Sequence, residues 1–132
     1  MGYGESLGRL INDEKLDVPS ARELKDLIKK FPKDENTGAR VELLHSLING
    51  YSEEGVYALQ HNWKKASVLA SAYRHKIPLT VHPGIGYDII SNHPMFNGAS
   101  IGRAAQVDFQ KFASSVDGLD GGVVLSVGSA IM

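Results

Sequence analysis

The sequence contains no cysteine, which excludes disulfide bonds, thiol catalysis and cysteine-ligated zinc. It also lacks any run of about 18 apolar residues, the length that a membrane-spanning helix needs. Its first residues have neither the basic nor the apolar region of a signal peptide. Neither sign of charge predominates, because 14 basic and 15 acidic residues leave a net charge of −1. These absences predict a cytoplasmic protein that binds neither membranes nor nucleic acid.

The remaining composition is that of a soluble globular protein. The 132 residues are 42% hydrophobic and 22% charged, which predicts one domain over residues 1–132. Apolar residues recur at helical spacing in residues 20–31, 38–49, 63–75 and 100–116. Ser20 and Glu23 form a capping-box pattern at the first of these stretches. A short helical turn is expected near residues 7–11, and residues 53–60 fit either a strand or a helix.

Two apolar stretches read as buried strands, near residues 77–82 and 122–127. A helical segment separates them, so the pattern predicts a βαβ unit and an α/β fold with a parallel sheet. In such sheets ligands bind beyond the carboxyl ends of the strands. Those ends are His82-Pro-Gly-Ile-Gly86 and Gly128-Ser129. Because two strands leave unpaired edges, we expect the chain to be a fragment of a larger protein or to depend on subunit contacts.

Residues 77–103 hold the candidate chemistry, in His82, Asp88 and His93. A histidine can donate or accept a proton near neutral pH, and an aspartate can orient it or bind a cationic or hydroxylated ligand. The same three side chains supply donors for a metal, although their spacing matches no known metal motif. An alternative remains open, in which Asp88 and His93 only cap or staple an ordered loop. Gly84 and Gly86 lack the third glycine of a dinucleotide fingerprint.

The order of motifs from Ser67 onward resembles the deoxyhypusine synthase family, including its less characterised bacterial relatives. The matching elements cover about half of the chain. In chain order they are a helix over residues 67–76, Ile77-Pro78, the loop from Gly84 to Asp88, His93-Pro94, Asn97-Gly98-Ala99, Ile101-Gly102, Asp108-Phe109 and the strand with glycines over residues 121–128. The elements from His93 to Gly102 look closest to the bacterial relatives.

The resemblance implies a three-layer Rossmann-like fold that binds NAD between the subunits of a homo-oligomer. In the family, the enzyme oxidises spermidine, a polyamine, and transfers its aminobutyl group to a protein lysine through an imine on an enzyme lysine. Asp88 and His93 would then face the cofactor and amine pocket as catalytic residues. The cofactor would lie against the two strand ends, at positions His82, Gly84, Gly86, Gly128 and Ser129.

One departure from the family leaves the enzymatic activity open. The family's catalytic lysine follows a tryptophan and a glycine, whereas the only tryptophan here, Trp63, is followed directly by Lys64. We therefore expect a central part of a deoxyhypusine-synthase-like protein that binds NAD, a polyamine or both. Two alternatives are a non-catalytic oligomerising α/β module and a metal-dependent hydrolase that uses His82, Asp88 and His93.

Overall fold

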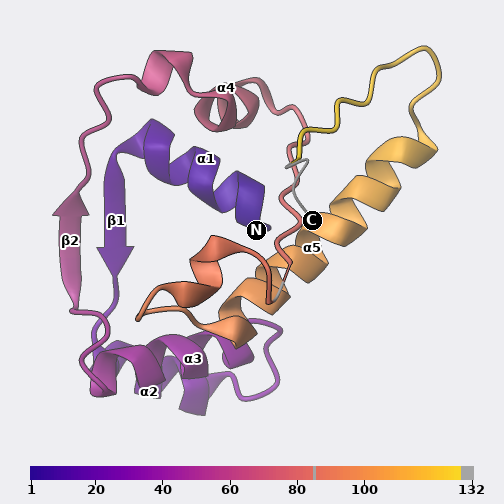
Figure 1. The fold of residues 1–132 in the computed structure, drawn as a ribbon. Coiled ribbons are helices and arrows are strands. Elements are labelled where there is room, and N and C mark those ends of the chain that lie inside the picture. Colours follow the sequence, from indigo (N-terminus) through magenta and orange to yellow (C-terminus); the bar gives the residue numbers. More distant parts are fainter. Residues whose placement is uncertain (85, 129–132) are drawn as a thin grey trace. The chain divides into compact units, whose positions relative to one another are not determined.

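The computed structural model describes residues 1–84 and 86–128 (Figure 1). Its elements, in chain order, are α1 (Tyr3–Asp13), β1 (Lys15–Val18), α2 (Ala21–Lys30), α3 (Thr37–Ile48), β2 (Gly55–Ala58), the 3-10 helix η1 (Lys64–Ala66), α4 (Val68–His75), the 3-10 helix η2 (Ile89–Asn92) and α5 (Gly98–Asp117). They form two compact units, one built from residues 1–12 and 63–132 and the other from residues 13–62. Within the described residues, every helix is too short or too polar to cross a membrane.

The unit of residues 13–62 contains two strands and two helices. β1 and β2 run antiparallel, in a register that pairs Lys15 with Ala58. α2 begins at the predicted capping box, where Ser20 Oγ accepts the Glu23 N–H and the Glu23 carboxylate accepts the Ser20 N–H. α2 packs against α3, and Leu24 of α2 is buried.

Several local predictions for this unit are confirmed. α2 and α3 lie within one or two residues of the predicted ranges. Gly50 after α3 has a left-handed backbone, with φ +71°, as is common for the residue that follows a helix. Residues 55–58, which fitted either type of element, form β2. β1 was not predicted, because three of its four side chains are exposed and its sequence shows no apolar run.

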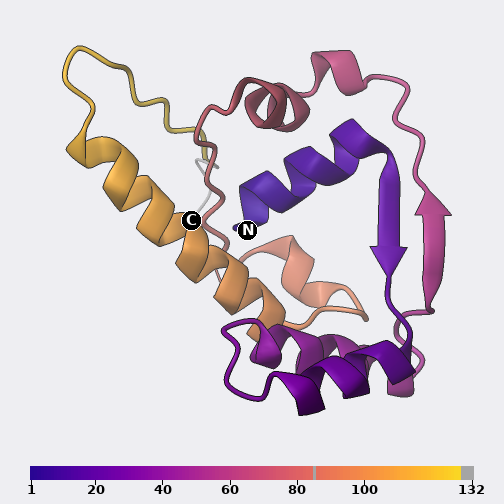
Figure 2. The same ribbon diagram turned by 180° about the vertical axis from the view of Figure 1, so that it is seen from behind.

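In the other unit, α1 uses glycines to lie directly against backbone. A Cβ on Gly4 would come within 2.4 Å of the Leu79 carbonyl oxygen, and one on Gly8 within 2.5 Å of the Leu69 carbonyl oxygen. Residues at these positions must therefore be glycine for α1 to approach α4 and the segment after it. Figure 2 shows α1 and α4 from behind, next to one another. α1 is longer than the short turn expected near residues 7–11.

α4 begins later than its sequence pattern predicted. The helical spacing predicted a start at residue 63, but Ser67 caps α4 by accepting the Ala70 N–H at 3.2 Å. The preceding turn is the separate 3-10 helix η1. α5 agrees better with its prediction, because it extends only one or two residues beyond the expected range at each end. Its cap, Asn97, accepts the Ser100 N–H.

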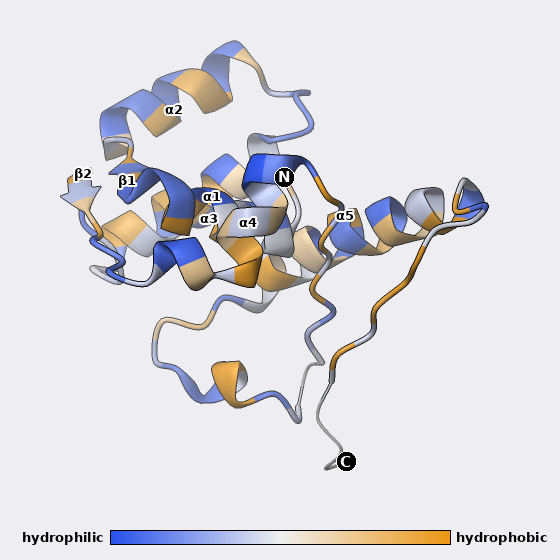
Figure 3. Ribbon diagram, turned by 90° about the horizontal axis from the view of Figure 1, so that it is seen from above, coloured by the Kyte–Doolittle hydropathy of each residue, from blue (hydrophilic) through white to orange (hydrophobic). Residues whose placement is uncertain are grey.

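The predicted parallel sheet is wrong for the described part of the chain. Residues 77–82 and 122–127 are extended but form no strand, and the one sheet there is the antiparallel pair β1 and β2. The fold is mixed α/β but mostly helical, without a three-layer Rossmann-like sheet among these residues. The apolar composition of a segment indicates that it tends to be buried. A strand also needs a neighbouring strand whose backbone groups can hydrogen-bond to its own, and composition does not specify that neighbour. Figure 3 shows residues 122–128 as a largely apolar extended segment after α5.

Candidate functional site: the loop between α4 and α5

The candidate residues lie on the connection that joins α4 to α5, within the unit of residues 1–12 and 63–132. We call residues 82–96 the candidate loop. Its described residues comprise the short helix η2, turns at residues 86–87 and 94–95, and irregular backbone, so its side chains are positioned by local hydrogen bonds and by its two ends.

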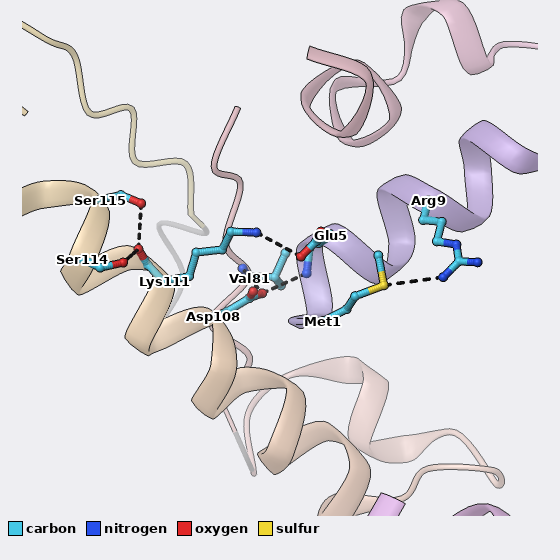
Figure 4. A network of polar contacts seen from close by, with 9 residues as sticks. Met1, Glu5, Arg9, Val81, Asp108, Lys111, Ser114 and Ser115 are labelled. Atoms are coloured by element: carbon cyan, nitrogen blue, oxygen red, sulfur yellow. Dashed lines mark hydrogen bonds and ion pairs between the residues drawn. The ribbon is translucent and has the colours of Figure 1, made fainter. Parts of the chain in front are cut away.

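Asp108 of α5 anchors the base of this loop. Its side chain is fully buried, and its Oδ2 accepts the N–H of Val81 at 2.9 Å and the N–H of Gly4 at 2.8 Å. Gly4 lies in the first turn of α1, where backbone N–H groups are unpaired and the helix dipole is positive. One carboxylate therefore joins three segments, the N-terminus of α1, residue 81 and α5 (Figure 4).

Two further contacts support this anchor. A Cβ on Gly2 would collide with the Asp108 carboxylate at 1.7 Å from Oδ1, so this position accepts only glycine. Lys111, one turn along α5, forms an ion pair with Glu5 of α1 at 3.0 Å (Figure 4). The anchoring role of Asp108 was not predicted from the sequence. The available signal was an aspartate whose neighbours three and four residues away include Ala104, Ala105 and Phe112, together with the closely spaced glycines at the start of the chain.

Asp88 closes a tight turn at the start of the loop. Its carboxylate Oδ2 accepts a short hydrogen bond from the Gly84 N–H, and its own N–H donates to the Gly84 carbonyl at 3.1 Å. The Tyr87 ring lies over Gly84, because a Cβ there would be only 1.8 Å from the ring carbon Cζ. Gly86 has a left-handed backbone, with φ +97°. The left-handed backbone thus requires glycine at position 86, whereas the ring over Gly84 belongs to an exposed side chain that can move.

The two loop histidines also have local partners. The Nδ1 of His93 accepts the Met95 N–H at 3.1 Å, which leaves the proton of a neutral ring on the exposed Nε2. His82 has its Nε2 3.0 Å from the Thr80 hydroxyl, and its ring meets the edge of Phe112 with centroids 5.6 Å apart. Each imidazole is therefore held in one orientation at the surface.

The three candidate side chains are not joined to one another. No hydrogen bond or ion pair between His82, Asp88 and His93 occurs in the described residues, and nowhere in residues 1–84 and 86–128 do three histidine or acidic side chains come together as a metal site. Gly128 is described and exposed, whereas Ser129 lies outside the described residues. The hydrogen bonds of Asp88 and His93 are those of an ordered loop, the alternative that the sequence left open.

Comparisons of the chain with known protein families, with curated proteins and with solved structures give no match.

Proposed function

We propose that the candidate loop is one wall of a binding site for a small cationic or hydroxylated ligand, in a protein that resembles deoxyhypusine synthase. The ligands that this resemblance implies are a polyamine and NAD. The observation that carries the proposal is the fixed orientation of three exposed or partly exposed polar side chains, His82, Asp88 and His93, on one loop. Side chains held in advance lose less conformational entropy when a ligand binds.

Each side chain offers a different interaction. The Asp88 carboxylate can pair with an ammonium group or accept a hydrogen bond from a ribose hydroxyl. His93 presents Nε2–H as a donor, since its Nδ1 already accepts the Met95 N–H. His82 offers an imidazole beside the Phe112 ring, which supplies an apolar surface for the carbon chain of an amine or for a flat ring.

The proposal is one of binding and not of aminobutyl transfer. The family reaction needs a lysine nucleophile, and the lysine that follows Trp63 starts η1 instead. Its ammonium group lies 3.3 Å from the Asn12 carbonyl oxygen, a hydrogen bond that orients it toward α1. Binding by a single wall of a pocket should be weak. We expect a dissociation constant on the order of millimolar, which corresponds to a binding free energy of about 4 kcal/mol.

Calorimetric titration with spermidine, and separately with NAD, tests this proposal. We expect saturable binding, and we expect Asp88→Asn to weaken spermidine binding about tenfold, or roughly 1.4 kcal/mol, because it removes the negative charge. The asparagine oxygen can still accept the Gly84 N–H, so the turn should remain folded. Asp120→Asn, an exposed charge outside the loop, is the matched control.

Two results would contradict the proposal. One is the absence of saturable heat with either ligand in a protein whose circular dichroism is that of the folded chain. The other is equal weakening by Asp88→Asn and Asp120→Asn, which would reduce the role of Asp88 to general electrostatic attraction.

A second candidate function is that of a non-catalytic assembling module. The observation that favours it is the small core, since the buried hydrophobic residues of the described chain are Leu24, Ala70 and Ala72. Large apolar side chains remain exposed on α5 and in residues 123–127, a pattern typical of surfaces that other polypeptide covers. The molar mass in solution, measured by light scattering, tests this candidate without any ligand.

A further inference from the structure

The buried carboxylate of Asp108 has one oxygen without a partner. Its Oδ2 accepts two backbone N–H groups, whereas its Oδ1 is buried and accepts no hydrogen bond from any of the described residues. The Asp108 side chain has no exposure to water. A buried carboxylate oxygen without a donor has a cost in free energy, so a group that could donate to it is worth seeking.

Gly2 lies directly against this oxygen. A Cβ on Gly2 would come 1.7 Å from Asp108 Oδ1 and 2.5 Å from its Cγ, so the Gly2 Cα touches the carboxylate. Gly2 is itself buried, and its carbonyl oxygen accepts the Ser6 N–H at 3.0 Å, at the start of α1. The beginning of α1 and the unpaired oxygen are therefore neighbours.

The nitrogen of Gly2 does not satisfy Oδ1 while Met1 is attached to it. As part of a peptide bond this nitrogen carries one hydrogen, which is fixed in the plane of the peptide and does not bond to Oδ1. Met1 is 55% exposed, so little of its side chain would be lost from the interior if the residue were removed.

We propose that the peptide bond between Met1 and Gly2 is a processing site, and that its cleavage creates an ammonium group on Gly2 that pairs with Asp108 Oδ1. The reaction is a hydrolysis. Water adds across the bond, the methionine leaves with a carboxylate, and the Gly2 nitrogen becomes –NH3⁺. A peptidase that cuts between methionine and a small residue supplies the catalysis. Cleavage at this bond has the same consequence whatever precedes Met1.

A rotation about one bond brings the new ammonium group to the oxygen. Without a preceding residue, the Gly2 nitrogen can turn about the bond between Cα and the carbonyl carbon. This rotation moves the nitrogen toward the position of the missing Cβ, which lies next to Oδ1. The carbonyl group stays in place, so its hydrogen bond with the Ser6 N–H persists. The nitrogen can stop at an ordinary charge-assisted hydrogen-bond distance from Oδ1, about 2.8 Å.

The charges of the pair compensate one another. A positive charge alone at the start of α1 would be opposed by the helix dipole. The Asp108 carboxylate offsets this effect with a full negative charge in direct contact. A buried ion pair is favourable when the remaining lone pairs are also hydrogen-bonded. Asp108 meets this condition, because its Oδ2 already accepts the N–H groups of Gly4 and Val81.

The new ion pair would strengthen the anchor at the base of the candidate loop. The same carboxylate accepts the N–H of Val81, the residue directly before that loop (Figure 4). Cleavage before Gly2 would therefore fix the start of the chain and residue 81 to one carboxylate. An effect on ligand binding rests on the proposed function, whereas the ion pair does not.

The stability of two forms of the chain that begin at Gly2 tests the proposal. One form has a free amine, and the other has an acetylated amine, which is uncharged and takes the place of the Met1 carbonyl group. Urea denaturation should give the free-amine form an unfolding equilibrium constant at least about tenfold smaller, because acetylation removes a charge-assisted hydrogen bond. In Asp108→Asn the two forms should unfold alike. The asparagine oxygen still accepts the N–H groups of Gly4 and Val81, so this variant should fold.

Chemical labelling of the amine is a second measurement, and it does not depend on stability. An amine-reactive reagent should modify the Gly2 amine more slowly in the folded wild-type chain than in folded Asp108→Asn, because the carboxylate holds and buries the ammonium group. The exposed Lys65 is the internal control, and its labelling rate should be the same in both proteins. Mass spectrometry of the intact chain purified from cells should show the loss of Met1.

Three results would overturn the proposal. These are retention of Met1 by the purified chain, equal unfolding of the free-amine and acetylated forms, and equal labelling of the Gly2 amine in wild type and Asp108→Asn. A chain that forms the ion pair but binds neither spermidine nor NAD would overturn the proposed function and leave this inference intact.

Discussion

At the scale of single residues, Asp108 determines how the candidate loop begins. A carboxylate without exposure to water is costly unless its oxygens are hydrogen-bonded. Asp108 Oδ2 accepts two backbone N–H groups, and one of them belongs to the positive end of α1. The Asp108 carboxylate therefore caps the start of α1 from a distant part of the sequence. The same oxygen, Oδ2, also accepts the N–H of Val81.

Asp108→Ala should lower the free energy of unfolding by about 2 to 4 kcal/mol. The change leaves the buried N–H of Gly4 and the partly buried N–H of Val81 without an acceptor, and it removes a charge that favours the start of α1. Urea denaturation followed by circular dichroism measures the loss. Asp120→Ala, an exposed change near the end of α5, should alter stability by less than about 0.5 kcal/mol. Equal losses in the two variants would show that Asp108 is not the anchor.

At the scale of the elements, the most predictable parts were those whose signals lie close together in the sequence. The capping box of Ser20 and Glu23 fixed the start of α2, and the apolar periodicity of residues 100–116 located α5 to within two residues at each end. The strands expected near residues 77–82 and 122–127 failed because pairing is not local. The Val81 N–H, which would have joined a sheet, donates to Asp108 instead.

The capping box should make α2 sensitive to acid. The N–H and the hydroxyl of Ser20 both donate to the Glu23 carboxylate, and these hydrogen bonds lower the pKa of Glu23. Because the folded-state pKa lies below the unfolded one, the stabilisation is complete above the ordinary glutamate pKa, about 4.3. It is lost as the pH falls through the lower folded-state pKa. Ser20→Ala removes the hydroxyl but keeps the backbone N–H, which is the larger cause, so NMR titration should show the Glu23 pKa rising only part of the way toward its ordinary value. An unchanged pKa would contradict this account.

At the scale of the whole molecule, the two units differ in what the sequence could predict. Residues 13–62 fold around neighbouring helices, and the helical periodicity located both of them. In the other unit, residues far apart in sequence make the decisive contacts, as with Gly4, Val81 and Asp108. A single sequence does not reveal such pairs. The candidate residues lie on one loop as expected, but the local partners of Asp88 and His93 follow from backbone geometry, which the sequence pattern does not specify.

The central claim is that residues 82–96 form the wall of a small-ligand site. Amide chemical shifts recorded by NMR during titration with spermidine, and then with NAD, test it most directly, because they locate binding residue by residue. The account predicts saturable shifts concentrated in residues 81–96 and at Phe112, which touches His82. Shifts that never saturate, or that saturate mainly in residues 13–62, would contradict it.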